Sequence, residues 1–120
     1  MSQQPSDGIF DELMETIIHR KSASPQASYT ASLFSGGVHQ ICSKISEEAA
    51  ELVEAAKQVP ESRQQQVHES ADLIYHVWVL LAQQNIPLSE IRNELASRFG
   101  ISGLEEKASR TDPSCEPDKP

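Results

Sequence analysis

Two long segments with helical periodicity, joined by a short link, most constrain the fold of this 120-residue chain. The first spans about Val38 to Gln58, and the second spans about Ser62 to Gln84. Pro60 lies between them and ends the first, because proline lacks the amide hydrogen that continues a helix. A link this short favours antiparallel neighbours. The first segment has a predicted apolar stripe of Ile41, Ile45, Ala49, Leu52 and Ala56.

Shorter helices are predicted on either side of this pair. One starts at Asp7, with Ser6 or Asp7 as its cap, and ends in the basic run at 19–21. Its apolar stripe consists of Ile9, Phe10, Leu13, Met14, Ile17 and Ile18. Another spans Ser89 to Arg98, with Gly100 following it. Residues 22–37 are predicted to form a loop with a short helical turn at "YTASLF". The sequence thus predicts an all-α, four-helix bundle.

Composition excludes several classes of protein. The net charge of −8 argues against a general nucleic-acid or membrane-surface binder, which needs clusters of Lys and Arg. No apolar run reaches the roughly 20 residues that span a bilayer, and the start of the chain lacks the pattern of a secretory signal. Cys42 and Cys115 are interpreted as reduced thiols, so we expect a cytoplasmic protein. The expected organisation is a leader (1–6), one helical domain (7–102), a lid segment (103–110) and a disordered tail (111–120).

Negative charge is concentrated in the first long segment, at Glu47, Glu48, Glu51 and Glu54. Like charges one helical turn apart repel by about 0.2–0.5 kcal/mol per pair. At about 100° per residue, Glu48 falls inside the apolar stripe and Glu51 falls at its border. Since a buried carboxylate without a partner is costly, we predict a positive group close to both. Glu47 and Glu54, taken alone, are interpreted as solvent-exposed.

The second long segment carries a matching polar stripe inside an apolar helix. Glu69, Asp72 and His76 have the spacing i, i+3, i+7 and share one face. If the helices are antiparallel, this face can meet Glu48 and Glu51. Four converging carboxylates favour Mg²⁺ or Mn²⁺ over zinc, which prefers His and Cys. The alternative is that both acidic pairs are merely solvated. His76 is predicted to hold one of the carboxylates through a ring nitrogen.

A family resemblance rests on these same residues. "EEAAE", followed 17 residues later by "ESAD", fits the EExxE…ExxD signature of the all-α NTP pyrophosphatase superfamily, which includes MazG-like enzymes and dimeric dUTPases. Within it, "SYTASLFSGGVHQICSKISEEAAELVEAAK", "HESADLIYHVWVLLA" and "RFGISGLEEKASR" resemble the phosphoribosyl-ATP pyrophosphatase family, over about Phe10 to Arg110. Ser46 departs from the pattern, where the family commonly has glycine.

The resemblance implies Mg²⁺-dependent hydrolysis of phosphoribosyl-ATP to phosphoribosyl-AMP and pyrophosphate, the second step of histidine biosynthesis. Mn²⁺ is the alternative ion. Carried over from the family motif, the metal ligands are Glu48, Glu51, Glu69 and Asp72. Glu47 is an additional ligand or orients the attacking water, so Glu47 and Glu48 are the catalytic candidates. Which carboxylate acts as the general base stays open.

Substrate-binding candidates come from three regions. Lys44 lies one turn before the acidic residues and either reaches the phosphates or forms an ordinary ion pair on the helix. The hydroxyl groups of Ser28, Tyr29 and Thr30 either contact the substrate or form a capping turn. From the C-terminal part of the chain, the candidates for a phosphate clamp are Arg98, Lys107 and Arg110.

Two other functions remain as alternatives. A house-cleaning (d)NTP pyrophosphatase of the MazG-like superfamily would use the same metal site, and a helical adaptor would use none. The nearly all-apolar second long segment leaves too little partner surface in one small chain. We therefore expect the bundle to be completed in a homodimer or higher homo-oligomer, as the resemblance also implies.

Overall fold

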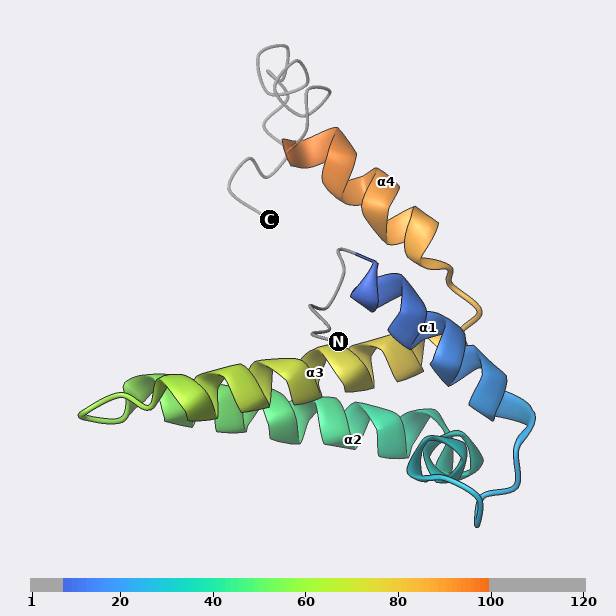
Figure 1. Cartoon of the computed structure of the whole chain (residues 1–120), viewed down its shortest axis with the longest axis horizontal. Helices are drawn as coiled ribbons and strands as arrows, with labels where there is room; N and C mark the ends of the chain where they lie inside the picture. The colour runs from blue at the N-terminus through green and yellow to red at the C-terminus, as the bar shows by residue number, and fades with distance from the viewer. Residues whose placement is uncertain (1–7, 100–120) are drawn as a thin grey trace, which may run out of the picture. The chain divides into compact units, whose positions relative to one another are not determined.

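The computed structural model describes residues 8–99, and in this part of the chain it contains helices and no strands. The predicted all-α class is confirmed. Two long helices, α2 (Tyr29–Lys57) and α3 (Arg63–Gln83), lie side by side and antiparallel, joined by the short connection that contains Pro60 (Figure 1). Ser62 caps α3, because its hydroxyl oxygen accepts a hydrogen bond from the Gln65 amide at 3.1 Å.

Helix α2 starts at Tyr29, where the sequence analysis predicted a short helical turn within a loop, rather than at Val38. Ser28 caps this start by accepting a hydrogen bond from the Ala31 amide at 3.0 Å. The helix is interrupted at Gly37, where φ is 88° and ψ is 178°. Figure 1 shows the part before this kink nearly end-on, turned away from the axis of the rest of α2. The kink directs the first turn of α2 toward α3, where Thr30 bonds to the Tyr75 hydroxyl group.

Gly37 is the position at which glycine is required. Its backbone conformation is one that side chains with a Cβ atom rarely adopt. We expect Gly37→Ala to lower the free energy of unfolding by about 1–3 kcal/mol, measured by urea denaturation. Gly36→Ala is the matched control, because Gly36 lies in the helix and its added methyl group would meet only the flexible side chain of Gln40. Equal stabilities of the two variants would contradict this role of Gly37.

Helix α1 (Ile9–His19) packs against α3, and the predicted start at Asp7, with Ser6 or Asp7 as its cap, lies outside the described residues. Met14 and Ile17 are its buried residues. The Trp78 indole N–H donates to the Phe10 carbonyl oxygen at 2.9 Å, which ties the start of α1 to α3. The short 3-10 helix η1 (Arg20–Ser22) follows. Its Lys21 ammonium group donates to the Ala82 carbonyl oxygen at 2.7 Å, at the C-terminal end of α3. These contacts hold α1 and η1 against α3.

Helix α4 (Leu88–Phe99) belongs to a second unit that starts at Pro87. Within α4, the Arg98 guanidinium group pairs with the Glu94 carboxylate at 2.7 Å. The predicted range of this helix, Ser89 to Arg98, agrees with the observed range of α4 to within one residue at each end. The leader (1–6), Gly100, the lid segment (103–110) and the tail (111–120) lie outside the described residues.

Candidate metal centre

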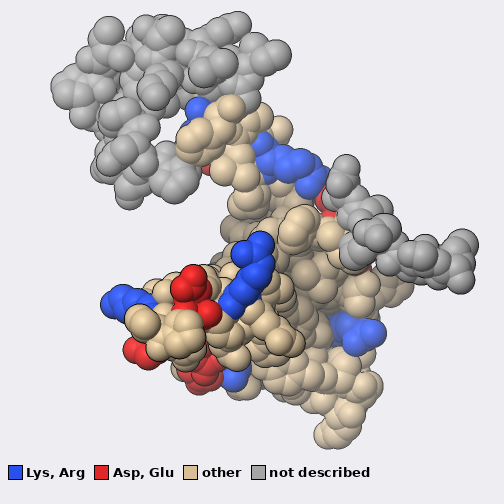
Figure 2. Space-filling model, turned by 60° about the vertical axis from the view of Figure 1, so that its left-hand side comes forward, with Lys and Arg blue, Asp and Glu red and all other residues tan. Residues whose placement is uncertain are grey.

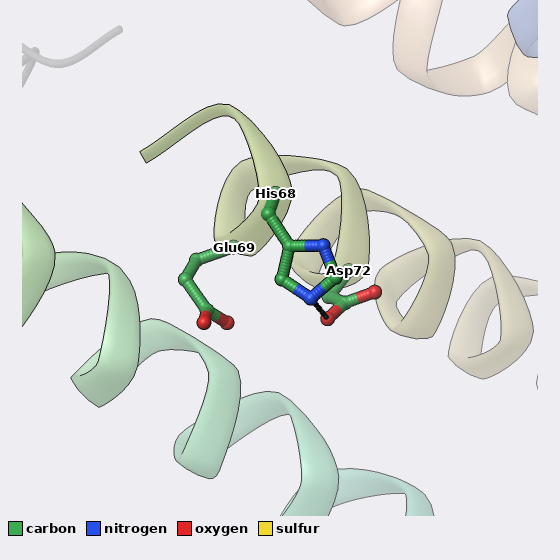
Figure 3. Close-up of side chains that lie close together, drawn as sticks. All are labelled: His68, Glu69 and Asp72. Carbon is green, nitrogen blue, oxygen red and sulfur yellow. Dashed lines mark ion pairs between the residues drawn. The ribbon is translucent and has the colours of Figure 1, made fainter. Parts of the chain in front are cut away.

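Carboxylates from α2 and α3 converge in the middle of the helical pair. Oxygen atoms of Glu48, Glu51 and Glu69 all lie within 4.8 Å of one another. Asp72 lies one turn beyond Glu69 on α3 and belongs to a second group with Glu69 and His68, also within 4.8 Å. Figure 3 shows that the Glu69 carboxylate lies on the side of α3 that faces α2. The antiparallel hairpin thus brings Glu48 and Glu51 together with Glu69, and Asp72 is connected to this group through Glu69.

Two of these carboxylates are buried without adequate hydrogen bonding. Glu48 is 7% exposed and Glu69 is 6% exposed. Oε1 of each has no hydrogen-bond partner among the described residues, although the second oxygen of Glu69 accepts a hydrogen bond from the Gln65 amide group. Because a buried polar atom without a partner is rare in native proteins, these two oxygens fit a site that binds a cation.

Electrostatics confirm that this site disfavours charge in the absence of a cation. Burial raises the pKa of Glu48 to about 7, with further increases from Glu69, Asp72 and Glu51. Glu69 also raises the pKa of Glu51, chiefly through a hydrogen bond between the two side chains. A divalent cation would reverse this effect, since it favours ionised carboxylates.

A pH dependence of stability follows from the raised pKa of Glu48. Between the ordinary value of 4.5 and about 7, the unfolded chain has released this proton while the folded chain retains it. With a chelator present, we therefore expect this group to lower the free energy of unfolding as the pH rises through that range. Urea denaturation at several pH values measures the effect. Glu48→Gln removes the group, so an unchanged pH profile in this variant would contradict the assignment.

Glu47 and Lys44 lie on the exposed side of α2. The side chain of Glu47 is 55% exposed, and one of its oxygens lies 3.2 Å from the Lys44 ammonium group. Glu47 raises the pKa of Lys44 through this hydrogen bond, and the Tyr29 phenol group also contributes. Lys44 therefore stays positively charged beside the carboxylates. The expected solvent exposure of Glu47 and Glu54 is confirmed.

His76 links the first turn of α2 to the carboxylate face of α3. The ring Nδ1 lies 2.8 Å from the main-chain carbonyl oxygen of Asp72, rather than from a carboxylate as predicted. A carbonyl oxygen only accepts, so Nδ1 carries the proton and Nε2 of the neutral ring is an acceptor. The Tyr29 hydroxyl group, 3.0 Å from Nε2, is then the donor. Helix geometry explains the difference, because the carbonyl group four residues earlier in α3 is the nearest acceptor.

The other predicted substrate-binding residues have different surroundings. Ser28 caps α2, and buried Thr30 bonds to Tyr75, so both hydroxyl groups make structural contacts. Tyr29 is 52% exposed and remains accessible beside Lys44. Arg98 pairs with Glu94 on α4. Lys107 and Arg110 lie outside the described residues.

His68 is a candidate that the sequence analysis missed. Its Nε2 lies 3.3 Å from Oδ2 of Asp72, as drawn in Figure 3. The available signal was the i, i+4 spacing of His68 and Asp72, which places both on one side of α3. That spacing is common for ordinary surface pairs, so it did not stand out.

The donor set fits a hard divalent cation. It consists mainly of carboxylate oxygens, which suit Mg²⁺ and Mn²⁺ better than zinc. Two ligands on opposite sides of one magnesium ion lie about 4.2 Å apart. Oxygen atoms of Glu48, Glu51 and Glu69 lie within 4.8 Å of one another, so they are close enough to share one ion. In the described residues, no helix is both long and apolar enough to cross a membrane.

Comparison with known proteins gives a consistent set of relatives. Residues 10–99 match the family described as phosphoribosyl-ATP pyrophosphohydrolase. The chain is 49% identical over 102 residues to the phosphoribosyl-ATP pyrophosphatase of Trichlorobacter lovleyi. The aligned residues cover 85% of this chain and 93% of that protein. It is 50% identical over 101 residues to the phosphoribosyl-ATP pyrophosphatase of Rhodopirellula baltica, covering 83% and 84% of the two chains. The histidine biosynthesis bifunctional protein HisIE of Wolinella succinogenes is 49% identical over 105 residues, which cover 88% of this chain and 45% of that protein.

Proposed function

Because the chain belongs to the phosphoribosyl-ATP pyrophosphohydrolase family, we propose that it hydrolyses phosphoribosyl-ATP to phosphoribosyl-AMP and pyrophosphate. The resemblance predicted from the two acidic motifs is thereby confirmed at the level of the family. The relatives named as pyrophosphatases support an enzyme over a helical adaptor. The name of the bifunctional relative supports a place in histidine biosynthesis.

One observation carries the proposal furthest. Two antiparallel helices place Glu48 and Glu69 in the interior, next to Glu51 and Asp72, and one buried oxygen of each has no partner within residues 8–99. A cation shared by these side chains would stabilise their charged forms. We therefore assign Glu48, Glu51, Glu69 and Asp72 as ligands of Mg²⁺, with Mn²⁺ as the alternative ion. The bound ion would offset the negative charge of the phosphate groups and lower the pKa of water.

The remaining roles follow from exposure and charge. Glu47 lies on the solvent side of the carboxylates, where it can accept a proton from the attacking water or orient that water. Lys44 stays protonated and can contact a phosphate oxygen of the substrate. His76 holds the Tyr29 hydroxyl group beside Lys44, which makes Tyr29 the accessible hydroxyl for the ribose or phosphate groups. Arg98, Lys107 and Arg110 are proposed as further phosphate contacts.

The experiment that tests the function compares substrates with the purified full-length chain. Pyrophosphate release is measured with phosphoribosyl-ATP, dCTP and dUTP, each with Mg²⁺ and each with a chelator. We expect release from phosphoribosyl-ATP alone, and only with Mg²⁺. Turnover of the deoxynucleotides without turnover of phosphoribosyl-ATP would replace the proposal with the house-cleaning alternative.

We also propose that the protein forms a homo-oligomer in the cytoplasm. The face of α3 opposite the carboxylates lines an apolar groove with α1, through Leu13, Val67, Ala71 and Ile74. Val67 is 64% exposed and Phe10 at the edge of this groove is 48% exposed, so a second copy would bury them. Acidic and basic side chains both lie near the end where α2 and α3 connect (Figure 2). Light scattering coupled to size-exclusion chromatography determines the number of copies.

A further inference from the structure

His68 brings a nitrogen ligand to the edge of the carboxylate site. Its Nε2 lies 3.3 Å from Oδ2 of Asp72, and Glu69 completes a group whose donor atoms lie within 4.8 Å of one another. Glu69 also belongs to the group formed with Glu48 and Glu51. In Figure 3, His68 and Asp72 lie together beside the Glu69 carboxylate, on one stretch of α3. The α3 residues therefore offer one imidazole nitrogen and two carboxylates to the same region.

Burial gives this group a second feature that points to a cation, which it shares with the group of Glu48, Glu51 and Glu69. Glu69 is 6% exposed, and its Oε1 has no hydrogen-bond partner among the described residues. An ion pair between His68 and Asp72 does not satisfy that oxygen. Surface pairs of this i, i+4 kind contribute little to stability, so the pair does not explain why the buried carboxylate is tolerated. A cation bound by all three residues would satisfy the free oxygen.

The chemistry of the donors selects the kind of ion. Mg²⁺ prefers oxygen ligands and near-ideal octahedral geometry, whereas an imidazole nitrogen favours divalent transition ions. Resting on the proposed cation-dependent function, we propose that His68 adds a nitrogen ligand beside Glu69 and Asp72 at this end of the carboxylate site, which shifts its preference from Mg²⁺ toward Mn²⁺ or Co²⁺. His68 then sets the metal preference of the protein, beyond what the carboxylates provide.

Metal binding without substrate tests the inference. The affinities for Mn²⁺ and for Mg²⁺ are measured by isothermal titration calorimetry on the full-length protein and on His68→Gln. We expect the dissociation constant for Mn²⁺ to rise at least about tenfold in this variant, since an imidazole ligand is lost. The constant for Mg²⁺ should change less than about twofold, because Mg²⁺ makes little use of nitrogen.

The matched control is His39→Gln. His39 is exposed on α2 and lies nine residues before Glu48, which places it on the opposite face of that helix. We expect both affinities to be unchanged in this control. Circular dichroism verifies that each variant is folded, which is expected because the His68 side chain is 66% exposed.

Electron spin-echo spectroscopy of bound Mn²⁺ reads out the nitrogen directly. We expect a coupling to ¹⁴N in the unchanged protein and its loss in His68→Gln. A coupling that persists in the variant, or an equal change in the two affinities, would overturn the assignment of His68 while leaving the carboxylate site intact. Absence of any Mg²⁺ or Mn²⁺ binding in the unchanged protein would overturn the proposed metal site itself, and the inference with it.

Discussion

Glu48→Gln is expected to abolish turnover of phosphoribosyl-ATP while the helical fold is retained. An amide group keeps the shape of the side chain but loses the negative charge that attracts the cation. Since metal ions contribute several kcal/mol to stabilising the transition state, we expect the rate to fall about 10³-fold or more. Pyrophosphate release measures the rate, and far-ultraviolet circular dichroism measures the helical content.

Stability separates a functional role of Glu48 from a structural one. With a chelator present at neutral pH, the variant should be at least as stable as the unchanged protein, because the buried carboxylate with its pKa near 7 is gone. Glu54→Gln is the matched control on the same helix, since Glu54 is exposed and lies outside both carboxylate groups. Full activity of Glu48→Gln would remove Glu48 from the site.

The helical hairpin and its acidic face could be predicted because they depend on periodicity alone. The projection placed Glu48 among apolar residues, and the structure shows it buried between Ile41 and Ala55 on the same stripe. These three positions are seven residues apart, which corresponds to 3.5 residues per turn. In a straight helix, positions seven residues apart differ by about 20° in direction around the axis. The projection therefore placed the end of the apolar stripe at Ala56, which is exposed, whereas the buried residue is Ala55.

The interruption at Gly37 was indicated by the local pattern, but the length of the helical segment before it was not. Two consecutive glycines indicate a break, and the sequence analysis accordingly placed a loop before residue 38. The segment is helical because Ser28 caps it and because Leu33 is fully buried. Capping and tertiary burial thus hold the segment before the glycines in a helix, while the helix is still interrupted at Gly37. Only the three-dimensional structure shows that the kink aims Tyr29 and Thr30 at α3.

The contacts of the two histidines on α3, His68 and His76, could not be predicted from the sequence either. His76 shares a face with Glu69 and Asp72, but its ring bonds to a carbonyl group of its own helix and to Tyr29. Spacing shows which side chains share a face and leaves the rotamer undetermined. The same limit applies to His68, whose distance from Asp72 depends on how each side chain rotates about its own helix position.

Glu69→Gln is expected to reduce turnover at least as much as Glu48→Gln does. The reason is that Glu69 belongs both to the group with Glu48 and Glu51 and to the group with His68 and Asp72. We expect turnover to fall about 10³-fold or more and the stabilisation by Mg²⁺ in thermal unfolding to disappear. If Glu48 and Glu69 hold one cation together, combining the two substitutions should reduce the rate little further, because residues that act as a unit are not additive. Separate roles predict instead that the two losses multiply. The rates of the two single variants and the double variant, measured at saturating Mg²⁺, decide between these outcomes, and multiplied losses would contradict a shared cation.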